Sequence, residues 1–156
     1  MTLEIKRISS TESDLVISLF NKYRIFYKQP SDIELAKAFI QARLDKNESV
    51  IFVATFKDKD EVFPVGFTQL YPKFSSGKAI KIWVLNDLYV EQAFRKQGVG
   101  ESLIKIALDY AKNDQASHVE LSTAVDNYIA QSLYESIGFK KQSPNTDFFM
   151  YKIDVK

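Results

Sequence analysis

The sequence contains no cysteine, a single histidine (His118), and only five glycines and four prolines among its 156 residues. The absence of cysteine excludes disulfide bonds, zinc–thiolate sites and a cysteine nucleophile. Because chains without disulfides suit a reducing compartment, we expect a cytoplasmic protein. One histidine cannot assemble a metal cluster by itself, so we expect no metal site, and His118 is interpreted as structural or exposed.

A bias toward charge of one sign and long apolar runs are absent as well. The formal net charge is +1, with 26% charged residues, which argues against a surface that binds nucleic acid or a membrane. No apolar run approaches the ~20 residues that a membrane span requires, and the first residues show no signal peptide. Apolar residues make up 46% of the chain, which suits one domain over residues 1–156.

The spacing of apolar residues predicts helices and strands along the whole chain. Ser31 and Glu34 stand at the spacing of a capping box at the start of the second helix. The expected helices cover 10–28, 31–46, 99–113 and 127–139. The expected strands cover 2–8, 49–56, 62–72, 78–90, 118–123 and 146–155, with room for a short further strand at 139–142.

The element order β-α-α-β-β-β-α-β-α-β predicts an α+β fold. Three successive strands followed by a strand–helix–strand unit favour a mixed, mostly antiparallel sheet of six or seven strands, with about four helices on both faces. The helix at 99–113 must cross over between the strands at 78–90 and 118–123. These two strands are therefore expected to be parallel neighbours.

The segment RKQGVG, Arg95–Gly100, stands at the head of the amphipathic helix. The first four N–H groups of a helix lack partners inside it, and its N-terminus carries partial positive charge. Gly98 and Gly100 would let an anion approach these amides, and Arg95 and Lys96 add formal charge. The pattern suits a phosphate group, although a tight strand-to-helix turn without a ligand explains the same glycines.

Two motifs in the second half of the chain carry a family resemblance. RKQGVG resembles the R-x-x-G-x-G/A motif of the GNAT superfamily of acetyl-CoA-dependent N-acyltransferases, and LYV (88–90) precedes it at that superfamily's spacing. NYIAQSLYESIGF (127–139) resembles the second block, N-x-x-A-x-x-L-Y-E-x-x-G-F, at every named position. VGFTQLYPKFSSGKAIKIWVLNDLYV (65–90) shows a weaker resemblance to the diamine (spermidine/spermine) acetyltransferases.

The resemblance implies a GNAT-like fold and transfer of an acetyl group from acetyl-CoA to a primary amine, by direct attack in a ternary complex. The acceptor would be a small-molecule or peptide amine. A homodimer fits the resemblance, since dimers are frequent in the superfamily. The alternative is an acyl-CoA-binding or sensing domain without catalysis. A Rossmann-type oxidoreductase conflicts with Leu103, which stands where a third glycine would be needed.

The resemblance also assigns the residues that would bind acetyl-CoA. Asn127 and Ala130 would lie beside the pantetheine arm, although Asn127 would cap the next helix in any protein. The backbone of the strand end would bond to the same arm, where the strand splays from its parallel neighbour, and one N–H would polarise the thioester carbonyl. That strand end comprises Leu88, Tyr89 and Val90. The pyrophosphate would be held by main-chain amides of Lys96, Gln97, Gly98, Val99, Gly100 and Glu101, with Arg95 beside them.

Two residues are candidates for proton transfer. Tyr134 lies two helical turns after Asn127 and would, by the resemblance, protonate the departing thiolate. A tyrosine packed in the core is the alternative. Asp87 directly precedes LYV and is a candidate for binding or deprotonating the amine, because an alkylammonium with a pKa near ~10.4 is unreactive at neutral pH. A structural hydrogen bond or salt bridge is the alternative for Asp87.

The acceptor side is expected to include Asn86, Asp87 and Tyr27. Tyr23, Arg24 and the segment 67–72 are further candidates for its wall, and a core stripe explains Tyr23 and Tyr27 equally well. Asn86 stands where the diamine enzymes tend to carry a first acid. Glu120, on the neighbouring strand, is a reserve candidate for the base, with a solvated strand face as the alternative.

Overall fold

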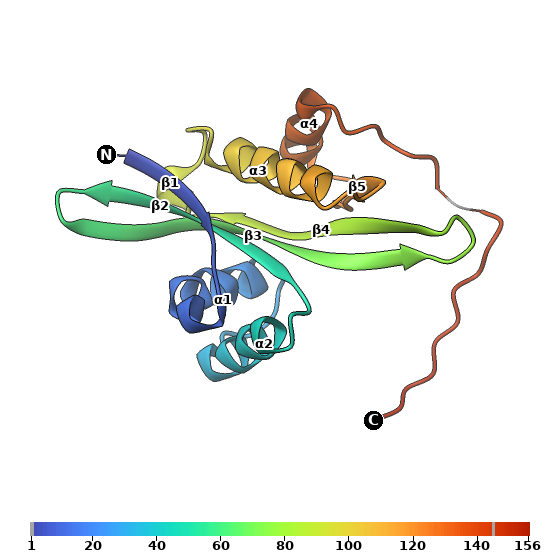
Figure 1. Ribbon diagram of the computed structural model, residues 1–156, viewed down its shortest axis with the longest axis horizontal. Helices are drawn as coiled ribbons and strands as arrows, with labels where there is room; N and C mark the ends of the chain where they lie inside the picture. The colour runs from blue at the N-terminus through green and yellow to red at the C-terminus, as the bar shows by residue number, and fades with distance from the viewer. Residues whose placement is uncertain (1, 145) are drawn as a thin grey trace. The chain divides into compact units, whose positions relative to one another are not determined.

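The computed structural model describes residues 2–144 and 146–156 (Figure 1). The chain divides into two compact units, Met1–Ser122 and Thr123–Lys156. The elements of the first unit are β1 (Thr2–Arg7), the 3₁₀ helix η1 (Ser10–Leu15), α1 (Ile17–Phe26), α2 (Ile33–Asp45), β2 (Val50–Asp58), β3 (Glu61–Ser75), β4 (Ile80–Val90), the 3₁₀ helix η2 (Gln92–Phe94), α3 (Val99–Asn113) and β5 (His118–Glu120). The second unit contains α4 (Tyr128–Ile137).

The first unit is built on a sheet with the strand order β1-β2-β3-β4-β5. The three pairings from β1 to β4 are antiparallel, and β4 pairs with β5 in parallel. Figure 1 shows α1 and α2 on one face of this sheet and α3 on the other. The expected mixed, mostly antiparallel sheet is confirmed, and so is the crossover through α3 that makes β4 and β5 parallel neighbours.

Apolar side chains on both faces of the sheet form the core of the first unit. On the face covered by α1 and α2, Phe67 of β3 packs with Ile51 and Val53 of β2 and with Phe20 of α1, all of them buried. On the other face, α3 buries residues that recur at helical spacing, as a helix covering a sheet requires. These residues are Val99, Leu103, Ile104, Ala107 and Ala111.

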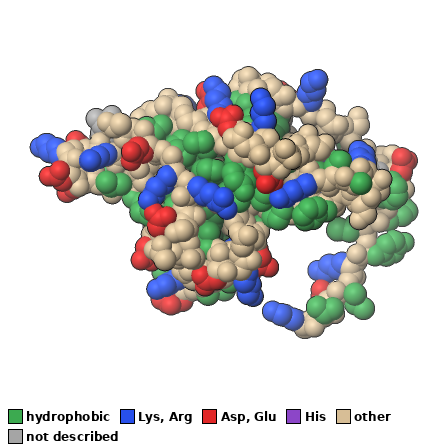
Figure 2. Space-filling model, in the orientation of Figure 1, with side chains coloured by type: hydrophobic (Ala, Val, Ile, Leu, Met, Phe, Trp, Pro, Cys, Tyr) green, Lys and Arg blue, Asp and Glu red, His purple; other side chains and the backbone are tan. Residues whose placement is uncertain are grey.

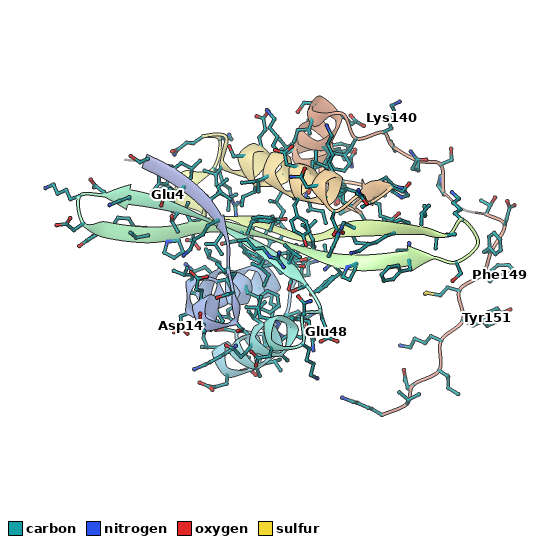
Figure 3. All side chains as sticks on the ribbon, in the orientation of Figure 1. Glu4, Asp14, Glu48, Lys140, Phe149 and Tyr151 are labelled. Carbon is teal, nitrogen blue, oxygen red and sulfur yellow. The ribbon has the colours of Figure 1, made fainter. Side chains whose placement is uncertain are left out.

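The prediction of six or seven strands is wrong, because the described sheet has five. Segments 139–142 and 146–155 form no strand, and β5 ends at Glu120 rather than at residue 123. Phe149 and Tyr151 project from the extended C-terminal segment (Figure 3) and are each 89% exposed. The alternation of side chains is present there, but a strand needs a neighbour that accepts and donates its backbone hydrogen bonds.

The two N-terminal helices differ from the prediction at their ends. The first is divided into η1 and α1, and α1 ends at Phe26 rather than at residue 28. The cap of α2 is Asp32, whose carboxylate accepts from Leu35 N at 3.0 Å, and not Ser31. Asn21 of α1 explains this shift, because it donates to Ser31 Oγ and accepts from Asp32 N, and so holds Ser31 outside the helix.

Charged side chains of both signs are mixed on the face of the molecule that Figure 2 presents, where Lys and Arg are interspersed with Asp and Glu. Of the helices in the described ranges, none is both long and apolar enough to cross a membrane.

Gly66 offers a test of how closely β3, β4 and α3 approach one another. A Cβ at this position would lie 2.9 Å from Tyr89 O and 3.3 Å from Leu103 Cδ1. We expect Gly66→Ala to lower the free energy of unfolding by about 1–3 kcal/mol, because backbone atoms would have to shift. Urea denaturation followed by circular dichroism measures this loss.

Gly77→Ala is the matched control, since a Cβ there meets no atom within 4 Å. We expect its unfolding free energy to stay within about 0.5 kcal/mol of wild type. Equal stability of the two variants would contradict the close approach at Gly66.

Candidate active site

The end of β4 lies beyond the parallel pairing of the sheet. Ile82, Trp83 and Val84 pair with His118–Glu120 of β5. Strand β5 ends there, whereas β4 continues to Val90 and stays paired with β3 as far as Gly66. The segment from Leu85 to Val90 therefore has a paired strand on one side alone within the described sheet, which is the divergence expected for LYV.

The loop after β4 leads into an uncapped helix N-terminus. Helix α3 begins at Val99, and Gly98 is its N-cap residue with φ +82°, in the left-handed region that favours glycine. No side chain accepts a hydrogen bond as a cap at this end. Because a Cβ at Gly98 would meet no atom within 4 Å, the backbone conformation, and not packing, calls for glycine here. The first-turn amides, among them those of Gly100 and Glu101, are thus open to an external acceptor.

Arg95 joins this loop to the end of β4. Its Nε donates to Val90 O at 2.8 Å, and its guanidinium lies over the ring of Tyr89, 5.6 Å from the centroid. Lys96 and Gln97 are exposed, and Lys96 has a positive φ of 61°. Arg95 therefore brings together the two backbone segments that were expected to bind the cofactor.

A β-bulge places Asp87 inside the sheet. Gln69 pairs with Asp87, but the next pair is Leu70 with Leu85, so Asn86 is an extra residue in β4. Asn86 is exposed, whereas Asp87 is only 2% exposed. The carboxylate of Asp87 accepts from Asn86 Nδ2 at 2.7 Å and from Gln69 Nε2 at 2.6 Å. The bulge thus turns one carboxylate toward the interior beside the end of β4.

Burial is the largest influence on the pKa values of Asp87 and of the two tyrosines near it, Tyr23 and Tyr71. It raises the pKa of Asp87, and hydrogen bonds from Asn86, Gln69 and Tyr23 act against that shift. Burial, and then the charge of Asp87, raise the pKa of both Tyr23 and Tyr71. The two phenols stay protonated near neutral pH, so Asp87 is the group of the cluster able to take up a proton.

Gln69 and Tyr71 were expected to be wall residues within 67–72, but the direct bond from Gln69 to Asp87 was not foreseen. Alternation along β3 puts both on the same face as Phe67. The bond to Asp87 became visible only from the sheet register. Gln69 is completely buried, and its Oε1 has no hydrogen-bond partner among the described residues.

Tyr27 is linked to Asp87 through Tyr23. The Tyr23 hydroxyl donates to Asn86 O at 3.2 Å, and the rings of Tyr23 and Tyr27 lie 4.9 Å apart. The three residues expected on the acceptor side therefore belong to one contiguous group. Glu120 does not belong to it, because its carboxylate pairs with Lys73 at 2.7 Å and with His118, and the bond from Lys73 lowers its pKa.

The second unit carries the remaining candidates on α4. Asn127 is the N-cap, and its Oδ1 accepts from Ala130 N at 3.1 Å, so its structural role as a helix cap is present. Tyr134 is half-buried and its ring lies 6.0 Å from that of Phe139 at 67°. Gly138, with φ +122°, ends the helix as expected.

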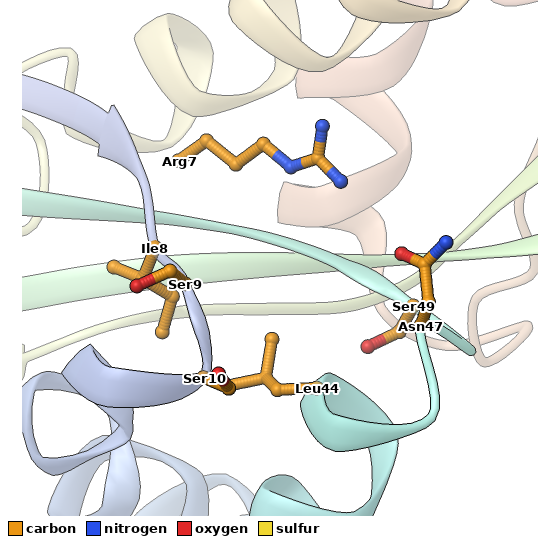
Figure 4. Close-up of a pocket in the computed structure, with 7 residues that line it drawn as sticks. All are labelled: Arg7, Ile8, Ser9, Ser10, Leu44, Asn47 and Ser49. Atoms are coloured by element: carbon orange, nitrogen blue, oxygen red, sulfur yellow. The ribbon is translucent and has the colours of Figure 1, made fainter.

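A concavity of about 310 Å³ lies elsewhere in the first unit, between the end of β1 and the start of β2 (Figure 4). None of the expected site residues lines it. The buried Ser49 Oγ has no hydrogen-bond partner among the described residues. No group of three or more His, Asp or Glu side chains in the described parts is arranged to hold a metal ion. The residues that line the concavity are Arg7, Ile8, Ser9, Ser10, Leu44, Asn47 and Ser49.

Comparison with known proteins decides the family. The Acetyltransferase (GNAT) family matches residues 16–139. The chain belongs to the GNAT family. It is 40% identical over 153 residues to an uncharacterized N-acetyltransferase of Bacillus subtilis, with 98% of each chain covered. It is 32% identical over 127 residues to a probable acetyltransferase of Haemophilus influenzae, covering 81% of this chain and 83% of the relative.

Solved structures agree with this family assignment. The crystal structure of a probable acetyltransferase matches with a TM-score of 0.86 and 38% identity, over 97% of this chain and 99% of the other. An aminoglycoside N-acetyltransferase in complex with CoA shares the fold, with a TM-score of 0.75 and 18% identity over 97% and 95% of the two chains. The protein is therefore an N-acetyltransferase of GNAT fold, in a family that uses acetyl-CoA, and a non-catalytic binding domain is not favoured.

The burial of Asp87 predicts a stability that depends on pH. A carboxyl whose pKa is raised by folding contributes stability below its unfolded pKa of about 3.9, and this contribution is lost as the pH rises through the folded value. We expect Asp87→Asn to raise the melting temperature at pH 8 by a few degrees and to change it less at pH 4. A flipped Gln69 amide could present its unpartnered Oε1 to the new Asn Nδ2. Calorimetry at both pH values tests this, and a destabilised variant at pH 8 would contradict it.

Proposed function

We propose that this N-acetyltransferase moves the acetyl group of acetyl-CoA to a primary amine by direct attack in a ternary complex, and that residues 1–156 act as one catalytic domain. The observation that carries the proposal is the buried Asp87 beside the end of β4, on the strand that leads to the N-terminus of α3, where no side chain caps the helix. A proton acceptor and an anion-binding loop are thereby separated by only the last residues of one strand.

The proposal assigns the cofactor to backbone groups at the two segments that Arg95 joins. The diphosphate would be held by the amides from Lys96 to Glu101, where the helix dipole and the missing cap favour an anion. The pantetheine arm would bond to the backbone of Leu88, Tyr89 and Val90, next to the unpaired side of β4. The resemblance adds Asn127 and Ala130 to this arm.

Asp87 would take the proton that the ammonium must lose before it can attack. Since Asp87 is 2% exposed and its carboxylate is bonded to Asn86 and influenced by the Tyr23 hydroxyl, a bridging water is the route that fits its burial. The neutral amine nitrogen would then bond to the thioester carbon, and the carbon–sulfur bond would break. A backbone N–H of β4 would stabilise the oxyanion, and Tyr134 would give its proton to the thiolate. The nitrogen would lose its second proton to water, from which Tyr134 would be reprotonated.

The acceptor is proposed to be a small-molecule or peptide amine bound near Asn86, Asp87 and Tyr27. Comparable aminoglycoside acetyltransferases share only the fold with this chain. A cytoplasmic location and a homodimer remain part of the proposal. Release of free thiol from acetyl-CoA over a panel of primary amines is the primary test, and binding of acetyl-CoA without turnover of any amine would overturn it.

Gly98→Asp tests the anion site. Asp tolerates the left-handed backbone better than most residues, so the fold is expected to persist, while its charge would stand against the diphosphate. We expect the Kd for coenzyme A to rise at least about tenfold, measured by calorimetry. Gly77→Asp adds the same charge at an open glycine in another turn and is expected to leave the Kd unchanged. Unaltered affinity in Gly98→Asp would remove the loop from the site.

Tyr134→Phe tests the general acid. Because the variant loses only a hydroxyl, we expect kcat to fall about 100-fold while the Kd for acetyl-CoA stays the same. Tyr128→Phe, at an exposed tyrosine of the same helix, is the control and should keep the wild-type kcat. Turnover at the wild-type rate in Tyr134→Phe would exclude it as the acid.

A further inference from the structure

Five aromatic rings form a continuous row that leads from the surface of α2 across α1. The ring centroids of Phe39 and Phe20 lie 5.6 Å apart, those of Phe20 and Tyr23 6.1 Å, those of Tyr23 and Tyr27 4.9 Å, and those of Tyr27 and Phe26 5.3 Å. This aromatic row ends in side chains that face solvent, since Tyr27 is 53% and Phe26 56% exposed. Exposed aromatic groups that adjoin a polar site are typical of a binding surface.

The aromatic row touches the catalytic cluster at one point. Tyr23, in the middle of the row, donates a hydrogen bond to Asn86 O. It is also near enough to Asp87 for the charge of that residue to raise the pKa of the Tyr23 hydroxyl. The ring centroids of Phe67 and Tyr23 lie 5.9 Å apart in an edge-on arrangement, and this contact helps to hold Tyr23 in place. An amine whose nitrogen is directed to Asp87 would therefore have the rest of its body along Tyr23 and Tyr27.

The charged residues around Asp87 and the aromatic row suit an acceptor that carries a single ammonium group. The residue next to Asp87 is the neutral amide Asn86, and the charge of Asp87 is, after burial, the main cause that raises the pKa of Tyr23. Glu91 is engaged with Lys22 at 2.9 Å. Glu120 is already held by Lys73 and His118. A polyamine or an aminoglycoside carries several ammonium groups, and an additional one would find Glu91 and Glu120 already paired with other side chains.

Basic residues flank the solvent end of the aromatic row. Arg24 and Lys28 lie within three residues of Tyr27 along the chain, and neither takes part in an ion pair of the described residues. Asp32, the acid that follows them, is engaged as the N-cap of α2. A second positive charge on the acceptor would meet like charge there, whereas an uncharged apolar group would not.

We propose that the acceptor is a primary monoamine with an aromatic or apolar body, whose nitrogen is directed to Asp87 while its body packs on Tyr27 and Phe26. This inference rests on the proposed amine acetylation and adds the substrate class. It differs from the diamine acceptors of the group that 65–90 resembles, and from the aminoglycosides named for fold neighbours.

The experiment compares phenethylamine, ethylamine, spermidine and kanamycin as acceptors for the wild-type protein, by thiol release. Phenethylamine and ethylamine share the same reacting group and differ by the ring. We expect kcat/KM for phenethylamine to exceed that for ethylamine at least about tenfold, and to exceed that for spermidine and kanamycin as well. Tyr27→Ala should lower the value for phenethylamine about tenfold through KM and should lower that for ethylamine much less.

Phe26→Ala is a second variant at an exposed position and should reduce the same preference. Phe74→Ala, at a 70% exposed ring on the hairpin between β3 and β4, is the control and should leave all four values unchanged. A preference for spermidine or kanamycin in the wild type would overturn the substrate class, and so would equal losses for phenethylamine and ethylamine in Tyr27→Ala. Failure to turn over any amine would instead count against the proposed function itself.

Discussion

Strand β4 is hydrogen-bonded to strands on both sides only between Ile82 and Val84, and the rest of the site depends on this limit. Beyond it, β3 alone holds β4 in register. The free side of the strand is what a cofactor arm could pair with, in place of a sixth strand. Helix α3 starts soon afterwards at Val99, and no side chain caps its N-terminus. The same stretch of chain therefore supplies both a strand edge and an open helix N-terminus. The end of the β4–β5 pairing and the start of α3 thus provide the two backbone features that the proposed function assigns to the cofactor.

The bulge at Asn86 adds chemistry to that geometry. Gln69 pairs with Asp87, and the next residue of β3, Leu70, pairs with Leu85. Asn86 is therefore the extra residue of β4 at this point. The carboxylate lies in the sheet, where burial makes its charged form costly and two amide donors only partly offset the cost. A buried carboxylate of this kind lowers the stability of the fold at neutral pH, but a raised pKa suits a group that transfers protons. The buried Oε1 of Gln69, which has no hydrogen-bond partner among the described residues, is a further cost to stability at this place.

Some parts of this site were accessible from residue patterns because they depend on local chain geometry. A glycine that begins α3, an asparagine that caps α4 and the neighbouring parallel strands follow from helix termini and crossover rules, and each was predicted correctly. The strand expected at 146–155 was wrong for the complementary reason. Its alternation satisfies the local condition, but the pairing partner is a property of the whole sheet. The prediction that Ser31 caps α2 was wrong for a similar reason, since Asn21 of another helix donates a hydrogen bond to the Ser31 hydroxyl.

Chain order and motif spacing by themselves predicted the family, the mixed sheet and the loop proposed to bind the diphosphate, because the residues of each motif are close in sequence. Only the tertiary structure decided that Gln69 and Tyr23 contact Asp87 and that five rings of α1, its C-cap residue and α2 form one row that meets this cluster at Tyr23. These contacts join residues far apart along the chain through sheet register and helix packing. No local pattern encodes them, because register and packing are settled by the burial of the whole core.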